Sequence, residues 1–394
     1  MKKSLVALAI LGTFAGVASA ATNVTLYGAV ELGYTDLFGK GEFANGATPN
    51  TTGLNFPQNA VKTGTLKKAQ GILAKSLDQT PRRSDRFGIM GEEDLGNGVS
   101  AIFKLEANLK ADNGDTTTGQ LFNRESTVGL KGSFGEVKIG RAKSQVELAT
   151  GGLLGTHGVT DVDLYAISST RHSNGLFYEY KNSGFTVGAD VTTKGGGWGN
   201  DSEGTDGSKI GYGARLGYYG NGLLARIAYQ NDGPVVASPV PSAIGKKQHE
   251  WAGVLAYNFY EGQKIPLAIG VSYAQGKGMA QGFFSATKLS SVDTVYAKKA
   301  STLGAIVRTW FSPNDTAYVL YQKRKSTAES GATLNNAWAL GLGYEHKLSK
   351  RTAIAIDTVY LKAKNVGVAS PYGFVGFPVS AKAYGYSVGL SHSF

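Results

Sequence analysis

Apolar and polar residues alternate with a period of two along most of this chain. The segment IGYGARLGY (210–218) has an apolar or aromatic residue at every even position and glycine or arginine between them, and 223–230, 338–346 and 383–394 repeat the alternation. Because successive side chains of a β-strand point to opposite faces, each segment predicts a strand with one apolar face. Helical spacing is almost absent, so the pattern predicts an all-β protein.

Two kinds of connection separate these segments, and they alternate along the chain. Seven are short and combine Gly, Asn, Asp, Ser or Pro, the residues that tight turns require. Eight are longer and polar, and together the connections leave sixteen strands. The short turns are predicted at 94–98, 132–136, 182–184, 219–222, 260–264, 311–315 and 347–351, and the long connections near 39–80, 112–119, 144–170, 195–206, 232–247, 277–294, 326–333 and 365–380.

The strict alternation of short and long connections decides the architecture. It places every short turn at one rim of the sheet, which is typical of transmembrane barrels with short periplasmic turns and long external loops. In hydrocarbon, the backbone groups of strands are all paired only when the sheet closes on itself. The sequence therefore predicts a 16-stranded antiparallel transmembrane β-barrel whose last strand pairs with residues 22–34. The bulky residues of that last strand, from Tyr384 to Phe394, are expected to face outward.

The first twenty residues have the features of a secretory signal. Two lysines precede an apolar stretch (5–17), and small residues follow it up to Ala20. This order predicts export with cleavage after Ala20. The apolar stretch is shorter than the roughly 20 residues that a spanning helix needs. We therefore predict a signal peptide at 1–20 and a single barrel domain at 21–394.

Composition narrows the possible partners. Lys and Arg number 40 against 29 Asp and Glu, a formal charge of +11 that falls to +9 without the two signal lysines. This excess favours anionic solutes or lipid phosphates as partners. No basic helix or binding module predicts a nucleic-acid partner. The absence of cysteine excludes disulfides and thiol ligands, and no fixed-spacing motif predicts a metal or a cofactor.

Four motifs resemble a known family. They are VTLYG after the signal, DRFGIMGEEDLGNGVSAIFKLE (85–106), FNRESTVGLKGSFGEVKIGR (122–141) and the final YSVGLSHSF. Together they resemble the general porins of Gram-negative outer membranes, especially the neisserial and β-proteobacterial branch. The resemblance implies a homotrimer and a third external loop folded into the lumen. It also implies that the strand ending at Phe394 is the signal read by the barrel-assembly machinery.

The resemblance further implies a constriction with basic side chains on one wall. Carried over by position, DRFG supplies Arg86, KIGR supplies Arg141 and TRHSNG supplies Arg171. Arg86 also fits the inward parity of its strand. Arg141 instead shares the parity of Val137 and Ile139, which a bulge at the strand end or a patch facing another subunit would explain.

Further candidates complete this constriction. Arg124 in FNRES and Lys104 in FKLE are expected on the same basic wall. The inward loop 144–170 offers Glu147, Asp161 and Asp163 as the opposing acids. Opposite charges across a low-dielectric constriction create a transverse field, and an excess of Arg lowers the barrier for anions.

These inferences predict an outer-membrane porin for passive diffusion of ions and small hydrophilic solutes, with anion preference. Two departures weaken the positive wall: Ala29 and Met90 stand at positions where basic residues occur in the family. Outer-membrane lipids and lipopolysaccharide are expected to surround the barrel, since cationic side chains can contact lipid phosphates.

Three alternatives belong to other classes of function. A substrate-specific channel for a sugar would line its lumen with aromatic rows, whereas Tyr27, Tyr219 and Tyr260 are the plausible inward aromatics; a channel for an organic anion stays open. A barrel adhesin would carry larger structured loops. An outer-membrane hydrolase needs a nucleophile with a positioned base. The five histidines are scattered, so no enzyme is predicted.

The first long connection (39–80) contains an unusual stretch. Residues 65–80 (TLKKAQGILAKSLDQT) place apolar side chains at helical spacing, with lysines elsewhere. This predicts a short helix packed on neighbouring loops. The alternative is a basic lid that attracts anionic solutes.

Overall fold

The structure of the chain is a computed structural model. The predicted signal peptide and residues 65–80, apart from two residues, lie outside the part that the structure describes. The described residues are 23–43, 71–72, 85–111, 114–116, 121–151, 166, 170–193, 210–234, 245–279, 296–331, 333–364 and 378–394.

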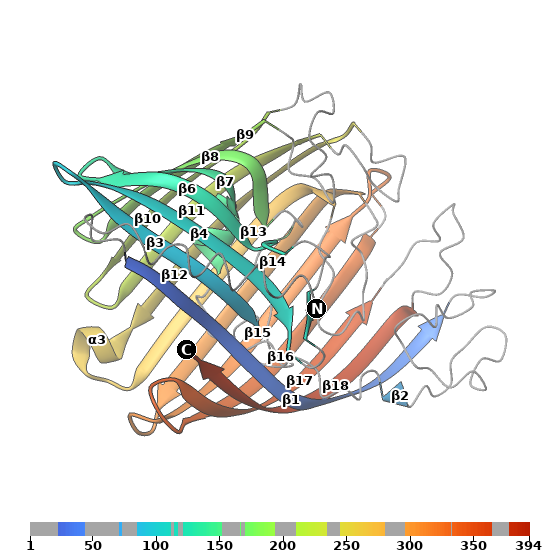
Figure 1. Cartoon of the computed structure of the whole chain (residues 1–394). Helices are drawn as coiled ribbons and strands as arrows, with labels where there is room; N and C mark the ends of the chain where they lie inside the picture. Colours follow the sequence, from blue (N-terminus) through green and yellow to red (C-terminus); the bar gives the residue numbers. More distant parts are fainter. Residues whose placement is uncertain are drawn as a thin grey trace, which may run out of the picture.

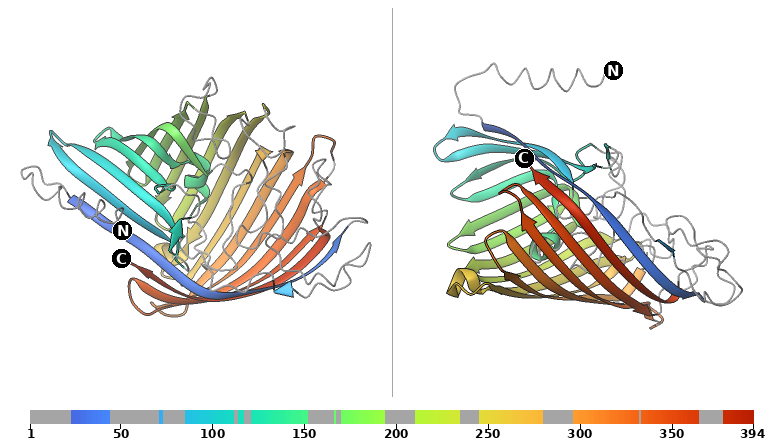
Figure 2. Two further views of the ribbon diagram at one scale, coloured as in Figure 1. Left: turned by 45° about the vertical axis from the view of Figure 1, so that its right-hand side comes forward. Right: turned by 90° about the horizontal axis from the view of Figure 1, so that it is seen from below.

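The described strands form one antiparallel sheet that closes into a barrel around an open interior (Figures 1 and 2). Two strands, β2 and β5, have two residues each, and the other sixteen strands form the wall of the barrel. The predicted 16-stranded architecture is therefore confirmed. The strands are β1 (Asn23–Phe43), β2 (Gly71–Ile72), β3 (Arg86–Gly96), β4 (Val99–Lys110), β5 (Asp115–Thr116), β6 (Glu125–Gly132), β7 (Gly135–Lys143), β8 (Arg171–Asn182), β9 (Phe185–Thr192), β10 (Gly211–Gly220), β11 (Leu223–Pro234), β12 (Lys247–Asn258), β13 (Leu267–Met279), β14 (Tyr296–Trp310), β15 (Asp315–Thr327), β16 (Thr333–Lys347), β17 (Thr352–Lys364) and β18 (Pro378–Ser393).

The seam joins the first and last strands, as predicted. β1 pairs with β18 from Ala29↔Ser393 onward, and with β3 on its other side. Beyond the last strand residue, Gly28 N–H donates to Phe394 O (3.0 Å) and Phe394 N–H donates to Gly28 O (3.1 Å). The terminal residue is thus held at the seam. β1 continues to Phe43, because its pairing with β18 extends into the segment predicted to be loop.

The two faces of the barrel differ as the alternation predicts. Apolar residues on the outer face are open to the surroundings; Ile227 and Leu255, for example, are 56% and 54% exposed. Their neighbours on the inner face, such as Ala228 and Val254, are buried. A continuous exposed apolar belt of this kind is suited to lipid rather than to water.

All seven predicted short turns connect neighbouring strands at one rim. The turn at 260–264 contains a short helix, α3 (Phe259–Gln263), which ends at Lys264 in a left-handed conformation (φ 61°). The other connections are long; β1 ends at Phe43 and β3 begins at Arg86. Among the described residues, no helix has both the length and the hydropathy to cross a bilayer.

The third long connection turns into the barrel. Its first residues form α2 (Gln145–Thr150), which begins after the N-cap Ser144. α2 contacts the inner faces of β9, β10, β11 and β12. The predicted inward-folded third loop is confirmed for this part of the connection.

We expect Gly28→Val to destabilise the barrel, because the seam leaves no room for a side chain there. A Cβ atom at Gly28 would lie 2.8 Å from the carbonyl oxygen of Arg86 and would overlap the ring of Phe394. Such overpacking costs about 1–3 kcal/mol. The measurement is the temperature at which the folded barrel converts to the unfolded form on a denaturing gel. Leu32→Val, on the lipid-facing side of the same strand, is the control and should leave that temperature almost unchanged.

Candidate functional site

A charged cavity of about 440 Å³ lies between α2 and the wall formed by β1, β3, β4, β6–β8 and β10. Seven cationic and three anionic side chains line it, which leaves an excess of four positive charges. Four of the five predicted basic residues are among them. The cations are Arg86, Lys104, Arg124, Lys138, Lys143, Arg171 and Arg215, and the carboxylates are Glu106, Glu125 and Glu179.

Glu106 gathers three of these cations. Arg124 Nε lies 2.5 Å from Glu106 Oε1, while Lys104 Nζ and Arg86 Nε lie 3.8 and 3.9 Å from Oε2. The Tyr27 hydroxyl donates to the same Oε2 at 2.8 Å. Cations packed this closely would repel one another, and a buried carboxylate offsets that repulsion. Glu106 therefore holds three cations in place while its single negative charge offsets only one of their three positive charges.

Glu125 connects the next two cations along the wall. Lys104 Nζ lies 2.8 Å from Glu125 Oε2, and Lys138 Nζ lies 3.4 Å from Oε1. Lys138 also pairs with Glu136 at 2.8 Å. A ladder of alternating charge thus runs along β4, β6 and β7.

Arg215 pairs with the carboxylate of Glu179, whereas Arg171 and Arg141 are held by neutral acceptors. Arg171 Nε donates to Arg124 O (2.9 Å), and Arg141 donates to Asn123 O (2.8 Å) and to Ser173 Oγ (2.5 Å). Among the described residues, no carboxylate lies within ion-pair distance of Arg171. Because a backbone carbonyl has no net charge, the charge of Arg171 stays available to the lumen.

Arg141 owes its position to a bulge, which was one of the two predicted explanations. The pairing of β7 with β8 shifts register between Gly140 and Ala142. Gly140 has φ 127°, a conformation that L side chains rarely adopt, and a Cβ atom there would collide with the carbonyl of Ser126. Arg141 supports the wall through its contacts but does not itself line the cavity.

Of the predicted loop acids, the structure places one. Glu147 lies on α2, and its carboxylate is 3.2 Å from Lys143 Nζ at the end of β7. Asp161 and Asp163 lie outside the described residues. The three aromatic residues predicted to face inward lie in two places. Tyr27 lines the cavity, whereas Tyr219 and Tyr260 lie at the short-turn rim.

Sequence reasoning missed six charged residues of the cavity, which are Glu106, Glu125, Lys138, Lys143, Arg215 and Glu179. Apart from Lys143, which lies beyond the bulge of β7, each has the inward parity of its strand; Glu106, for instance, is two residues from Lys104 on β4. Parity therefore could have identified them as residues of the inner face. Their grouping around one cavity depends on strand register, which a single sequence does not reveal.

Comparison with known proteins now decides the family. The Gram-negative porin family matches residues 7–366. The chain belongs to this family. It is 29% identical to outer membrane porin protein 32 of Delftia acidovorans and 26% identical to an outer membrane porin protein of Bordetella pertussis, with both chains of each pair fully covered. Among solved structures, an anion-selective porin from Comamonas acidovorans has a TM-score of 0.65 at 21% identity, over 95% of this chain and all of that one.

The resemblance inferred from the four motifs is thus confirmed. The protein is an outer-membrane porin, whose strands cross the membrane many times around a water-filled channel. Family and fold point to a channel rather than to an enzyme.

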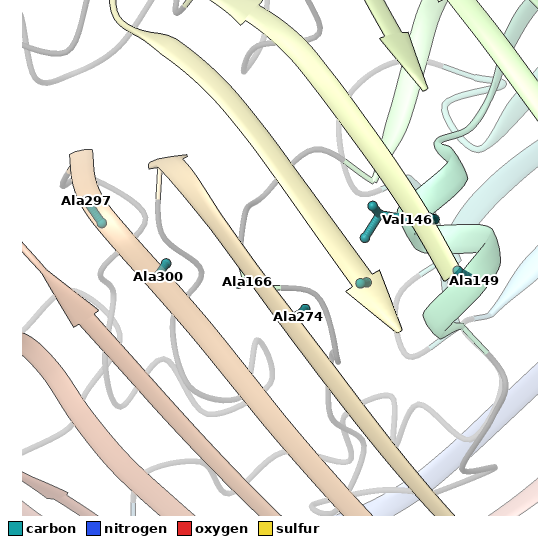
Figure 3. Close-up of a cluster of buried hydrophobic side chains, with 8 residues drawn as sticks. Val146, Ala149, Ala166, Ala274, Ala297 and Ala300 are labelled. Carbon is teal, nitrogen blue, oxygen red and sulfur yellow. The ribbon is translucent and has the colours of Figure 1, made fainter. Parts of the chain in front are cut away.

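In this porin, the inner wall opposite the charged cavity is shaped to receive α2. Val146 and Ala149 of α2 belong to a buried cluster whose other members are alanines of the lumen wall and of the inward loop (Figure 3). Small side chains on the wall leave room for the inward loop, including α2, as close packing requires. The alanines are Ala228, Ala252, Ala274, Ala297 and Ala300, with Ala166 of the same inward loop beside them.

A buried polar chain ties α2 to the wall. Val146 N–H donates to Gln230 Oε1 (3.3 Å), and Gln230 Nε2 donates to Asp232 Oδ1 (3.1 Å). His172 then bridges Asp232 through Nε2 (3.0 Å) and Asp190 through Nδ1 (2.6 Å). Ionised carboxylates only accept hydrogen bonds, so both ring nitrogens donate, as in imidazolium. The side chains of His172 and its two partners are at most 1% exposed.

Two further contacts hold the inward loop. Arg226 donates to the carbonyls of Leu148 and Ala149 at 3.4 Å, which satisfies acceptors at the end of α2. Ala166 N–H donates to the buried carboxylate of Glu250. The loop is therefore anchored at both of its described parts.

We expect His172→Ala to release this tether, because it leaves two buried carboxylates without their cation. Removing one partner of a buried ion pair costs about 3–5 kcal/mol. The variant should unfold at a lower temperature, and its open-channel current should fluctuate more in planar bilayers. His249→Ala is the control, since that ring is on the outer face, with its centroid 6.5 Å from that of Tyr229. Equal effects of the two substitutions would contradict the tether.

Proposed function

We propose that the protein forms a homotrimer of anion-preferring diffusion pores, each with its constriction at the charged cavity. The observation that carries this proposal is the excess of four positive charges around that cavity. The family resemblance supports the trimer. The similar porin from Comamonas acidovorans is described as anion-selective, which is the same preference as the one proposed for this chain.

The basic wall acts through its field rather than through tight binding. Arg86, Lys104, Arg124 and Arg171 face the lumen from β3, β4, the start of β6 and β8, with Arg141 supporting them. Glu147 lies on the loop side. An anion that enters the narrow region loses part of its hydration, and the fixed cations compensate for that loss. A cation meets the same charges as a barrier. Small hydrophilic solutes pass according to size and charge.

The two terminal segments of this porin are proposed to direct its export and its assembly into the membrane. Residues 1–20 are proposed to direct export and to be removed, which leaves the barrel domain 21–394. The strand that ends at Phe394 is proposed to be read by the barrel-assembly machinery. Its outward parity and its place at the seam support this role. Outer-membrane lipids and lipopolysaccharide are the expected surroundings.

A channel specific for organic anions is the second candidate function. Arg86, Arg124 and Arg171 converge with Tyr27 around one cavity, and guanidinium groups recognise carboxylates. Saturation of the chloride current by a small dicarboxylate would favour this candidate over general diffusion.

We expect the combined substitution of Arg86, Arg124 and Arg171 by Gln to reduce anion preference strongly. In water, a unit charge about 8 Å from the pore axis contributes roughly 0.5 kcal/mol, which salt screening reduces to about 0.2 kcal/mol. Because each charge acts on anions and cations with opposite sign, loss of three should lower the anion-to-cation permeability ratio by roughly eightfold. The measurement is the reversal potential across a planar bilayer with a KCl gradient. The matched control replaces Lys264, Lys350 and Arg351, at the short-turn rim, by Gln. A cation-selective reversal potential in the unmodified protein would overturn the proposed basic wall.

Glu125→Gln should have the opposite effect. It removes a carboxylate shared by Lys104 and Lys138, so the positive excess rises by one. The permeability ratio for anions should increase by about twofold on the same Coulomb scale. Glu261→Gln at the short-turn rim is the control. Because general damage to the pore would not raise selectivity, an unchanged or lower ratio would refute the field mechanism.

A further inference from the structure

A second pocket lies on the inner face of the barrel, at the short-turn mouth beside the seam. Its volume is about 250 Å³, and Arg308, Glu345 and Lys347 line it together with residues 29–31, 349–353 and 391–393. We call it the seam pocket. β1 and β16–β18, which supply most of these residues, are neighbours in the sheet next to the C-terminus (Figures 1 and 2). The seam pocket has no lining residue in common with the charged cavity, so the two are separate places in the lumen.

Strand parity directs the charged side chains of this pocket toward the lumen. Along β16, Leu342 and Tyr344 are exposed on the outer face, so Glu345 and Lys347 lie on the inner face. The same alternation along β1 places Leu32 outside and Glu31 inside.

The seam pocket combines both signs of charge. Four cationic side chains and two carboxylates line it, which are Arg308, Lys347, Lys350 and Arg351, and Glu31 and Glu345. Cations alone would repel an ammonium group, whereas this set offers a partner to each sign of charge.

Strand register sets the distance between one cation and one carboxylate. Lys347 is paired with Ala353. Ser391 follows on β18, and Glu31 follows on β1. Neighbouring strands lie about 4.8 Å apart, so the backbone positions of Lys347 and Glu31 are roughly 14 Å from each other. Only the small side chains of Ala353 and Ser391 lie between them, and both belong to the pocket lining.

The two charged groups at the ends of this line differ in exposure. Lys347 is exposed, and no carboxylate of the described residues lies within ion-pair distance of its ammonium group. Glu31 is only 2% exposed, and its backbone N–H donates to Asp85 Oδ1 (2.6 Å). A carboxylate that is shielded from bulk water interacts more strongly with an ammonium group than an exposed one does.

Arg308 contributes to the pocket from β14 through an arrangement built around Gly343. A Cβ atom at Gly343 would collide with the ring of Tyr318, so glycine gives this ring its place over β16. The Tyr318 hydroxyl donates to Asp357 Oδ1 (2.5 Å), and the guanidinium of Arg308 lies over the ring, 5.5 Å from its centroid. The ring thus holds a second cation at the edge of the seam pocket.

We propose that the seam pocket binds a zwitterionic solute of amino-acid size. The carboxylate of the solute lies at Lys347 and Arg308, and its ammonium group lies at Glu31. Hydrogen bonds between ionised partners are stronger than neutral ones. The volume of about 250 Å³ is below the range typical of pockets for drug-sized ligands, which favours a small solute.

Such a site complements the charged cavity. A zwitterion has no net charge, so a field that favours anions neither attracts nor repels it as a whole. A site at the short-turn mouth gives the zwitterion a favourable position in the lumen, and its passage requires that the site also release it readily. The proposal needs only the water-filled channel and does not depend on anion preference.

The test uses the full-length mature porin, refolded in a neutral detergent. The probe is L-alanine, and its binding is measured by saturation-transfer NMR. Propionate, which lacks the ammonium group, and L-alaninamide, which lacks the carboxylate, are measured in the same way. Loss of one charge-assisted contact should weaken binding by about tenfold, so L-alanine should bind about tenfold more tightly than either analogue.

Two variants separate the two ends of the solute. Lys347→Gln should weaken L-alanine binding by about tenfold and leave L-alaninamide binding unchanged. Glu31→Gln should weaken the binding of L-alanine but not that of propionate. Because Lys347 is exposed, its replacement should not affect folding, so this arm decides even where the buried Glu31 variant folds poorly. Lys264→Gln and Glu261→Gln, at another short turn, are the matched controls and should bind L-alanine normally.

Three results would overturn the proposal. Equal binding of propionate and L-alanine would make the seam pocket a site for anions only. Normal L-alanine binding by the Lys347→Gln variant, or equal weakening in the controls, would remove the assigned contact. The combined replacement of Arg86, Arg124 and Arg171 by Gln should leave L-alanine binding intact, and its loss there would place the zwitterion in the charged cavity instead. A pore that lacks anion preference but binds L-alanine through Lys347 would refute only the proposed selectivity.

Discussion

The structure depends on one constraint, which is that every backbone N–H and C=O group in the hydrocarbon layer must find a partner within the chain. An open sheet would leave the backbone groups of its two edge strands unpaired, so the last of the sixteen strands must pair with the first. The mutual hydrogen bonds between Gly28 and Phe394 complete this closure at the last residue of the chain. The glycine follows from the same constraint, because the terminal ring occupies the space where its side chain would be.

Closure separates the side chains into two environments that can be optimised independently. Outward positions meet lipid and tolerate almost any large apolar residue. Inward positions meet water, the inward loop or one another, so their chemistry is specific. The lumen alanines and the His172 chain show two ways to hold the inward loop in this setting. Alanines provide space and apolar contact for α2. The buried carboxylates around His172 belong to the chain of hydrogen bonds that sets the orientation of α2 against the wall.

The fold was largely predictable from the sequence, because period-two alternation and turn chemistry are local signals. The same reasoning placed Arg86 on the inner face and identified the parity conflict at Arg141, which the bulge at Gly140 resolves. It did not predict Glu106 as the centre of the cation cluster. That role depends on which residues lie opposite one another on β3, β4 and β6, and register is not encoded in any single strand.

Carboxylates within a cationic wall do not contradict anion preference. Lysine and arginine side chains are long and flexible, and cations alone would move apart toward bulk water. Glu106 and Glu125 hold Arg124, Lys104 and Lys138 at short distances, and Arg171 is held by a carbonyl without loss of charge. A fixed set of charges with a moderate positive excess gives a steady field across the narrow region. A larger excess would bind anions more tightly and slow their release, which fast diffusion does not permit. Acids in the wall thus set the strength of the field as well as the positions of the cations.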